Sequence, residues 1–132
     1  MVAQPEDDGT PGEPPATGTP EFETIAHALL HWCEVQPAKV MYRWLDDEGV
    51  ESVAWTYRDV LRRANAVANL LRGAPVGLEP GDRAACMYLP GLDFIAAFWG
   101  CLLAGVIAVP VYPVDIRNAK VQIVALAPPG CL

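Results

Sequence analysis

The chain has 132 residues, the length of one domain at most, and 52% of them are hydrophobic, enough to build a core. The net charge of -7 lies at the N-terminal end, since residues 1–38 hold seven acids and no Lys or Arg, whereas residues 39–132 hold nine acids and nine bases. Without a basic patch to neutralise phosphates, a nucleic-acid-binding function is excluded.

The N-terminal segment, residues 1–20, is rich in Pro, Gly, Thr and acids and predicts a disordered acidic tail. It has neither a basic and apolar secretory leader nor the Arg-rich composition of a mitochondrial transit peptide. The four cysteines form no C-x-x-C pair, and three lie in apolar runs. This pattern indicates a reducing compartment, without disulfides or a zinc site, and hence a cytoplasmic protein.

A first helix is predicted to begin at Thr19 as the N-cap, with Pro20 in the first helical position, and to end before Pro37. Its apolar residues recur at helical spacing: Phe22, Ile25, Leu29 and Trp32. Two strand-like runs follow, residues 40–45 and 50–56. The acidic turn between them contains Gly49, which predicts a β-hairpin.

A second helix is predicted from the capping-box pattern of Thr56 and Asp59, with Gly73 closing it. Its apolar face is formed by Val60, Ala64, Val67 and Leu71. The segment Glu79–Asp82 then has Pro second and Gly third, as a type II turn requires.

Beyond this turn the sequence predicts a strand at Arg83–Leu89, a helix at Leu92–Ala104 ended by Gly105, and a strand at Val106–Val111. Strand, helix and strand within about 30 residues indicate a βαβ unit with parallel strands and a right-handed crossover. The uncharged stretch Phe94–Val114 is also long enough to cross a bilayer, so a small single-span membrane protein stays open as an alternative, although a membrane partner is not favoured.

Few residues carry recognisable chemistry. His27 and His31 are four apart, as metal ligands can be, but Ala28 stands where a zinc protease needs Glu, and we interpret both as ordinary helix histidines. Gly100 and Gly105 have P-loop spacing but lack the Lys-Ser/Thr that must follow, so they indicate close helix packing.

Nucleophiles and acid–base pairs are equally weak candidates. Ser52, the only serine, lacks a nucleophile-elbow turn. We interpret Cys86 and Cys101, which lie in apolar runs, as core residues. The acids Asp46, Asp47 and Glu48 cluster in a turn, where they serve turn geometry. From the residues alone we assign no catalytic, cofactor-binding or metal-binding residue.

Two motifs carry a resemblance. The segment from Trp55 to Val60, followed by an Ala-rich helix and then by Leu78–Ala85, resembles the N-terminal signature of the adenylate-forming superfamily. The stretch Tyr88–Pro113, with its Pro-Gly-Leu-Asp-Phe, Gly-Cys-Leu and Val-Pro-Val-Tyr-Pro pieces, resembles the fatty acyl-AMP ligase branch. The adenylation-like domains of disco-interacting protein 2 are similar to this branch.

The resemblance implies ATP- and Mg²⁺-dependent activation of a fatty acid to an acyl-adenylate, and transfer of the acyl group to an acyl carrier protein or another acceptor. The implied fold is α/β: a partial three-layer N-terminal lobe with a βαβ unit and a peripheral β-hairpin. Residues 21–113 would be the N-terminal part of the AMP-dependent synthetase/ligase domain, and residues 114–132 a divergent tail.

The family's phosphate loop, which ends in Pro-Lys-Gly, has no match in this sequence. We therefore expect an inactive ligase fragment that itself binds no ATP or Mg²⁺. A non-catalytic interaction module that docks on a full-length paralogue is the second alternative.

Overall fold

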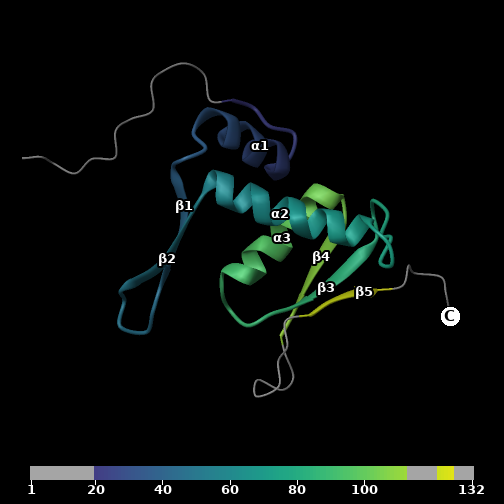
Figure 1. Ribbon diagram of the computed structural model, residues 1–132. Helices are drawn as coiled ribbons and strands as arrows, with labels where there is room; N and C mark the ends of the chain where they lie inside the picture. Colours follow the sequence, from purple (N-terminus) through teal and green to yellow (C-terminus); the bar gives the residue numbers. More distant parts are fainter. Residues whose placement is uncertain (1–19, 113–121, 127–132) are drawn as a thin grey trace, which may run out of the picture.

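The computed structural model describes residues 20–112 and 122–126, as a mixed arrangement of helices and strands (Figure 1). Its elements follow in the order α1 (Ile25–Val35), β1 (Val40–Leu45), β2 (Glu51–Thr56), α2 (Tyr57–Arg72), β3 (Arg83–Met87), α3 (Leu92–Ala104), β4 (Ile107–Val111) and β5 (Gln122–Leu126). The strands form two sheets, a β1–β2 hairpin and a sheet of order β4-β3-β5.

Helix α1 begins later than the sequence predicts. Its N-cap is Thr24, whose hydroxyl oxygen accepts a hydrogen bond from the His27 amide at 3.2 Å. Pro20 is not helical, and Thr19, the predicted N-cap, lies outside the described residues. The prediction followed the Pro and the acid after Thr19, whereas Thr24 caps the helix through its side chain without an acid in the first turn.

The hairpin forms as predicted, around a turn made by Asp46 and Gly49. The Asp46 carboxylate accepts hydrogen bonds from the amides of Glu48 at 3.1 Å and Val50 at 2.8 Å. Gly49 has φ of 80°, a left-handed conformation that side chains disfavour. The Asp46 carboxylate therefore serves the geometry of the turn, as the sequence predicts.

The predicted capping box of α2 is confirmed. The Thr56 hydroxyl oxygen accepts a hydrogen bond from the Asp59 amide at 3.2 Å, and the Asp59 carboxylate accepts one from the Thr56 amide at 3.1 Å. Gly73 follows the last turn, and its amide donates to the Asn69 carbonyl at 2.9 Å. Local sequence is thus sufficient to define both ends of this helix.

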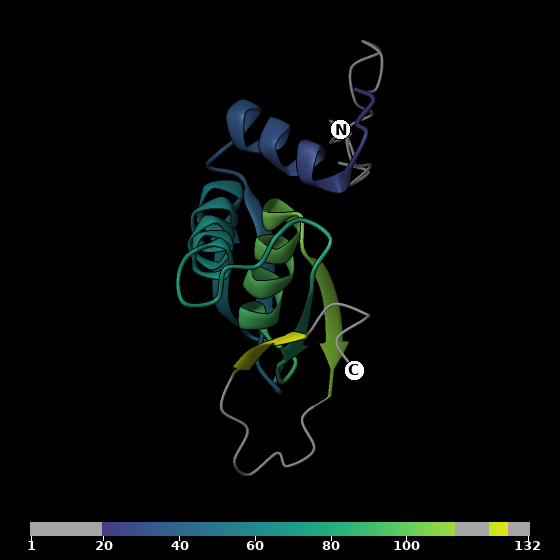
Figure 2. The same ribbon diagram turned by 90° about the vertical axis from the view of Figure 1, so that its right-hand side faces the viewer.

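The βαβ unit also forms as predicted, with β3 and β4 parallel and Arg83 opposite Ile107. Strand β5 adds to the other side of β3 in antiparallel orientation. Helix α3 lies between α2 and these strands (Figure 2). Both faces of α3 are therefore covered, which explains why it is apolar all round.

Two turns are hydrogen-bonded to each other where β3 and β4 begin. The amide of Gly81 donates to the carbonyl of Gly105 at 2.8 Å, and the amide of Ile107 donates to the carbonyl of Asp82 at 2.7 Å. Gly105 has φ of 73° and ends α3 in the left-handed conformation that its position predicts. These two hydrogen bonds, called the clasp below, hold the first residues of β3 and β4 side by side.

Buried side chains form two clusters. The hairpin-side cluster is built around the two tryptophans that α3 and the hairpin contribute, and its buried members are Leu29, Cys33, Trp55, Val60, Ala64, Ala96 and Trp99. The sheet-side cluster is made mainly of small residues, and its buried members are Ala68, Leu71, Ala84, Cys86, Cys101, Ala104 and Val106. Helices α2 and α3 contribute to both.

The stretch that suggested a membrane span is not one helix. It is divided between α3, which ends at Ala104, and β4, which pairs with β3. In the described part of the chain, no helix combines the length and the apolar character that a bilayer crossing requires. The single-span alternative is therefore wrong, because a hydropathy window cannot distinguish an apolar helix followed by an apolar strand from a single membrane-spanning helix.

Candidate functional site

A hollow lies beyond the carboxyl ends of β3 and β4, a common position for ligands in sheets with parallel strands. It has a volume of about 420 Å³. Its wall is formed by the segment after β3, the start of α3 and the end of β4: Cys86, Tyr88, Leu89, Pro90, Phe94, Pro110, Val111 and Tyr112. No Lys, Arg, Asp or Glu lines it, so it suits an apolar group and offers nothing to hold a phosphate.

Tyr88 is the polar residue most affected by this setting. Burial raises its pKa to about 12, and neighbouring charges, including Asp93, act in the same direction. Its ring lies edge-on to that of Phe94, with centroids 6.4 Å apart. Tyr88 therefore stays a neutral hydroxyl at physiological pH and is not a general base.

One residue of the wall, Cys86, contacts a second thiol that lies behind the wall. The sulfur atoms of Cys86 on β3 and Cys101 on α3 are 3.9 Å apart, and both residues are fully buried. The hydrogen bond from Cys101 lowers the pKa of Cys86 to about 7, while the same contact and burial raise the pKa of Cys101. Of the two, Cys86 is the sulfur that ionises first.

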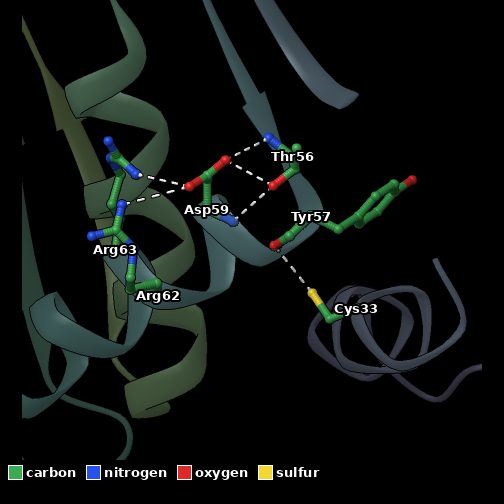
Figure 3. A network of polar contacts seen from close by, with 6 residues as sticks. All are labelled: Cys33, Thr56, Tyr57, Asp59, Arg62 and Arg63. Atoms are coloured by element: carbon green, nitrogen blue, oxygen red, sulfur yellow. Dashed lines mark hydrogen bonds and ion pairs between the residues drawn. The ribbon is translucent and has the colours of Figure 1, made fainter. Parts of the chain in front are cut away.

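A second group of polar side chains surrounds the start of α2 (Figure 3). The Asp59 carboxylate lies 3.5 Å from Arg62 and 3.7 Å from Arg63, and hydrogen bonds from Thr56 hold the pKa of Asp59 below its usual range. The Arg63 guanidinium stacks over the Trp55 ring at 4.2 Å. One buried nitrogen of Arg63, Nη1, has no hydrogen-bond partner among the described residues, and its 3.7 Å contact with Asp59 is an ion pair. The other contacts hold the start of α2 in place.

The same region anchors α1. The Cys33 thiol donates a hydrogen bond to the Tyr57 carbonyl oxygen at 3.3 Å (Figure 3). Burial raises the pKa of Cys33, so this thiol stays protonated and unreactive at neutral pH.

The histidine pair is not brought together with further ligands. His27 lies 3.8 Å from the Glu23 carboxylate, and the His31 ring packs against Phe22 and Trp32. Across residues 20–112 and 122–126, no group of three or more His, Cys, Asp or Glu side chains could hold a metal ion.

The remaining sequence candidates serve packing and turns. Gly100 lies where α3 touches α2, and a Cβ there would be 2.5 Å from Val67. Gly105 is the helix end described above. Ser52 is exposed on β2, and its hydroxyl donates to the Trp44 carbonyl at 3.2 Å, without a base beside it.

Sequence reasoning interpreted Cys86 and Cys101 as separate core residues and missed that they face each other. They are fifteen positions apart, a spacing that matches no cysteine motif. The available signal was the βαβ pattern, because a strand and its crossover helix bury their facing sides against one another.

Comparison with known proteins identifies relatives for most of the chain. The sequence model described as "AMP-binding enzyme" matches residues 29–126. The medium-chain-fatty-acid–[acyl-carrier-protein] ligase JamA of Moorena producens is 35% identical over 96 residues, which are 73% of this chain and 16% of the relative. The zebrafish (Danio rerio) disco-interacting protein 2 homolog B-A is 36% identical over 100 residues, 74% of this chain and 6% of the relative.

Among solved structures, the fatty acyl-adenylate ligase of Legionella pneumophila, in complex with acyl adenylate and pyrophosphate, is similar with a TM-score of 0.64 and 35% sequence identity. The match covers 70% of this chain and 16% of that one. The chain therefore spans about a sixth or less of the length of these relatives. The α/β fold predicted from the sequence is confirmed, as part of the N-terminal lobe of the adenylate-forming fold.

Proposed function

Because the chain belongs to the AMP-binding enzyme family and is of the fatty acyl-AMP ligase type, we propose that it supplies the outer part of a lobe in which a fatty acid is activated by ATP. The proposed reaction of the whole ligase converts the fatty acid and ATP into an acyl-adenylate and pyrophosphate, assisted by Mg²⁺. The acyl group then passes to the thiol of a carrier protein. This chain's role in that reaction is structural.

One observation carries the proposal: the same elements match the Legionella fatty acyl-adenylate ligase with a TM-score of 0.64, yet they cover only 16% of it. The match supports the ligase type. The small share supports a chain that does not complete the reaction by itself. The 132 residues include no Pro-Lys-Gly loop, and the hollow beyond β3 and β4 is lined without a charged side chain.

The test is an ATP–pyrophosphate exchange assay on the purified 132-residue chain, with fatty acids of several chain lengths. We expect no exchange above a blank without protein, while the Moorena ligase, assayed in parallel, supplies the positive control. Exchange that requires a fatty acid and rises in proportion to the concentration of this chain would refute the structural role.

A second candidate function is docking on a full-length adenylate-forming paralogue, and it is favoured by the exposed side of β4. Within the described residues β4 pairs with β3 alone, and Ile107 and Val111 on it are 47% and 36% exposed. A strand that has one unpaired edge and apolar side chains can accept a further strand from a partner. We expect the chain to capture the purified paralogue and the Ile107→Lys variant not to capture it. Equal capture by the two forms would contradict docking through β4.

We also propose a cytoplasmic location. Cys33, Cys86 and Cys101 are all free thiols in the structure, which fits a reducing compartment. Fractionation of cells that express the tagged chain should place it with cytoplasmic markers, and recovery with secretory-pathway markers would count against the proposal.

A further inference from the structure

The sulfur atoms of Cys86 and Cys101 are in contact. They are 3.9 Å apart, whereas a disulfide bond is about 2.0 Å long. Cys86 is on the central strand of its sheet, and Cys101 is in the second half of the helix that crosses over that strand. A disulfide between the two would therefore join β3 to α3 covalently.

The environment favours one sulfur as the attacking group. Cys86 has a pKa of about 7, because the Cys101 thiol donates a hydrogen bond to it, so a substantial fraction is thiolate at neutral pH. Cys101 retains its proton and lies in position to act second. This division into a nucleophilic and a resolving cysteine is what an oxidation-sensitive pair requires.

Cys86 is the member of the pair that borders the hollow. Although Cys86 is almost completely buried, it forms part of the wall of that open space of about 420 Å³, beside Tyr88 and Pro110. Cys101, with no exposed surface, is not in the wall. We therefore infer that an oxidant as small as hydrogen peroxide reaches the pair at Cys86, by way of the hollow.

We propose that Cys86 and Cys101 form a peroxide-reactive dithiol that closes into a disulfide between β3 and α3. The Cys86 thiolate attacks one oxygen of hydrogen peroxide, and the displaced hydroxide takes up a proton to become water, leaving a sulfenic acid. The Cys101 sulfur, on losing its proton, attacks the Cys86 sulfur, and the sulfenic oxygen leaves as a second water. Two thiols and one hydrogen peroxide thus give one disulfide and two waters.

This inference does not depend on the ligase reaction, and Cys33 provides an internal control. Cys33 is also buried, but it belongs to the hairpin-side cluster, and its thiol donates to a backbone carbonyl. Burial raises its pKa, so peroxide should leave it as a free thiol. The contrast separates a specific pair from general oxidation of buried cysteines.

The experiment treats the folded full chain, in a Cys131→Ser background, with a small excess of hydrogen peroxide, removes the peroxide with catalase and records the intact mass. The chain is then unfolded in guanidinium chloride with N-ethylmaleimide present, so that buried free thiols are also blocked, and the peptides are mapped by mass spectrometry. We expect an intact mass lower by two hydrogen atoms, a peptide linked through Cys86 and Cys101, and Cys33 carrying the maleimide. Dithiothreitol should restore the maleimide label at both positions of the pair.

Single variants test the order of the steps. Cys101→Ala should allow dimedone to trap a sulfenic acid at Cys86, whereas Cys86→Ala should leave Cys101 unoxidised at the same peroxide dose. Cys33→Ala, checked for retained helicity by circular dichroism, should form the linked peptide as the parent does.

A parent chain in which both members of the pair carry maleimide after peroxide treatment would overturn the proposal. So would linkage that proceeds equally fast in denaturant, because the reaction would then not need the folded geometry. Both of these results are measured on the chain that carries all three cysteines of the test, so they decide the proposal even if a single variant fails to fold.

Discussion

The hairpin-side and sheet-side clusters share helices α2 and α3 but are built from different side chains. The hairpin-side cluster is organised around Trp55 and Trp99, each of which also makes a polar contact, Trp55 with Arg63 and Trp99 with the Tyr42 hydroxyl at 3.0 Å. The sheet-side cluster contains three alanines and two cysteines, with Leu71 as its largest buried member.

The difference follows from how closely the elements approach. Small side chains such as those of the sheet-side cluster allow close approach of the backbones that carry them, so we expect α3 and β3 to be tightly packed there. The large rings of the hairpin-side cluster fill the space beneath the hairpin and α1, and we expect the neighbours there to adjust more easily. We therefore expect the sheet-side cluster to tolerate changes of volume less well.

The largest expected effect comes from a matched pair of leucines, Leu71 and Leu29, which are 1% and 2% exposed. Leu→Ala in a core costs about 2–5 kcal/mol, depending on how far the site can collapse. Leu71→Ala should lie near the top of this range, about 4 kcal/mol, because the alanines around it cannot fill the space. Leu29→Ala, on the outer helix α1, should cost about 2 kcal/mol.

Urea denaturation followed by circular dichroism measures both values. Equal losses of unfolding free energy in the two variants would contradict the proposed difference between the clusters, because both clusters would then collapse around a cavity equally well.

A smaller effect is expected at the interface of α2 and α3. In Gly100→Ala the new Cβ would lie 2.5 Å from the Val67 Cβ and 3.0 Å from the Ala64 carbonyl oxygen. The helices must separate, at a cost of about 2 kcal/mol that exceeds the gain of about 1 kcal/mol from better helix propensity.

Gly91→Ala is the matched control for the helix interface. Its added Cβ would have only the Leu89 carbonyl oxygen nearby, at 3.9 Å, and its φ of 166° suits any residue. The urea midpoint should fall clearly for Gly100→Ala and little for Gly91→Ala. A midpoint for Gly100→Ala at or above that of the parent would show that the helices are not tightly packed.

The smallest effect concerns the start of α2, on the hairpin side. Asp59→Ala removes one half of the capping box and should cost about 1 kcal/mol at pH 7. Because the pKa of Asp59 is lowered in the folded chain, its contribution is present above the unfolded value of about 3.9 and is lost as the pH falls through the folded pKa.

Denaturation midpoints at several pH values measure this dependence. The difference between parent and Asp59→Ala should narrow below about pH 4, and Asp47→Ala in the exposed hairpin turn should change stability by less than about 0.5 kcal/mol. A difference that stays constant into the acid range would mean that the carboxylate charge does not contribute.

Much of this fold could be predicted from the sequence because its signals are local. The capping box at Thr56 and Asp59, the left-handed Gly49 and the bounds of α3 each depend on residues within a few positions of one another. The start of α1 was misplaced because the Pro and the acid after Thr19 are a stronger local signal than Thr24, which caps the helix without an acid in its first turn.

What could not be predicted depends on contacts between distant segments. The pairing of β5 with β3 has no local signal, and the hollow exists only once the ends of β3 and β4 are side by side. The approach of Cys86 to Cys101 arises in the same way. The candidate site is therefore a product of topology, whereas the helices and the hairpin are products of local sequence.

The clasp between Gly81 and Gly105 has a consequence for how the hollow can change. The clasp lies directly before Arg83 and Ile107, the first pair of residues in the β3–β4 ladder. The register of the two strands is therefore set at the end farthest from the hollow. Substitutions at Leu89, Val111 or Tyr112 can therefore reshape the cavity wall while the ladder keeps its alignment. The end of the two strands at the clasp therefore fixes their register, and the opposite end determines the shape of the hollow.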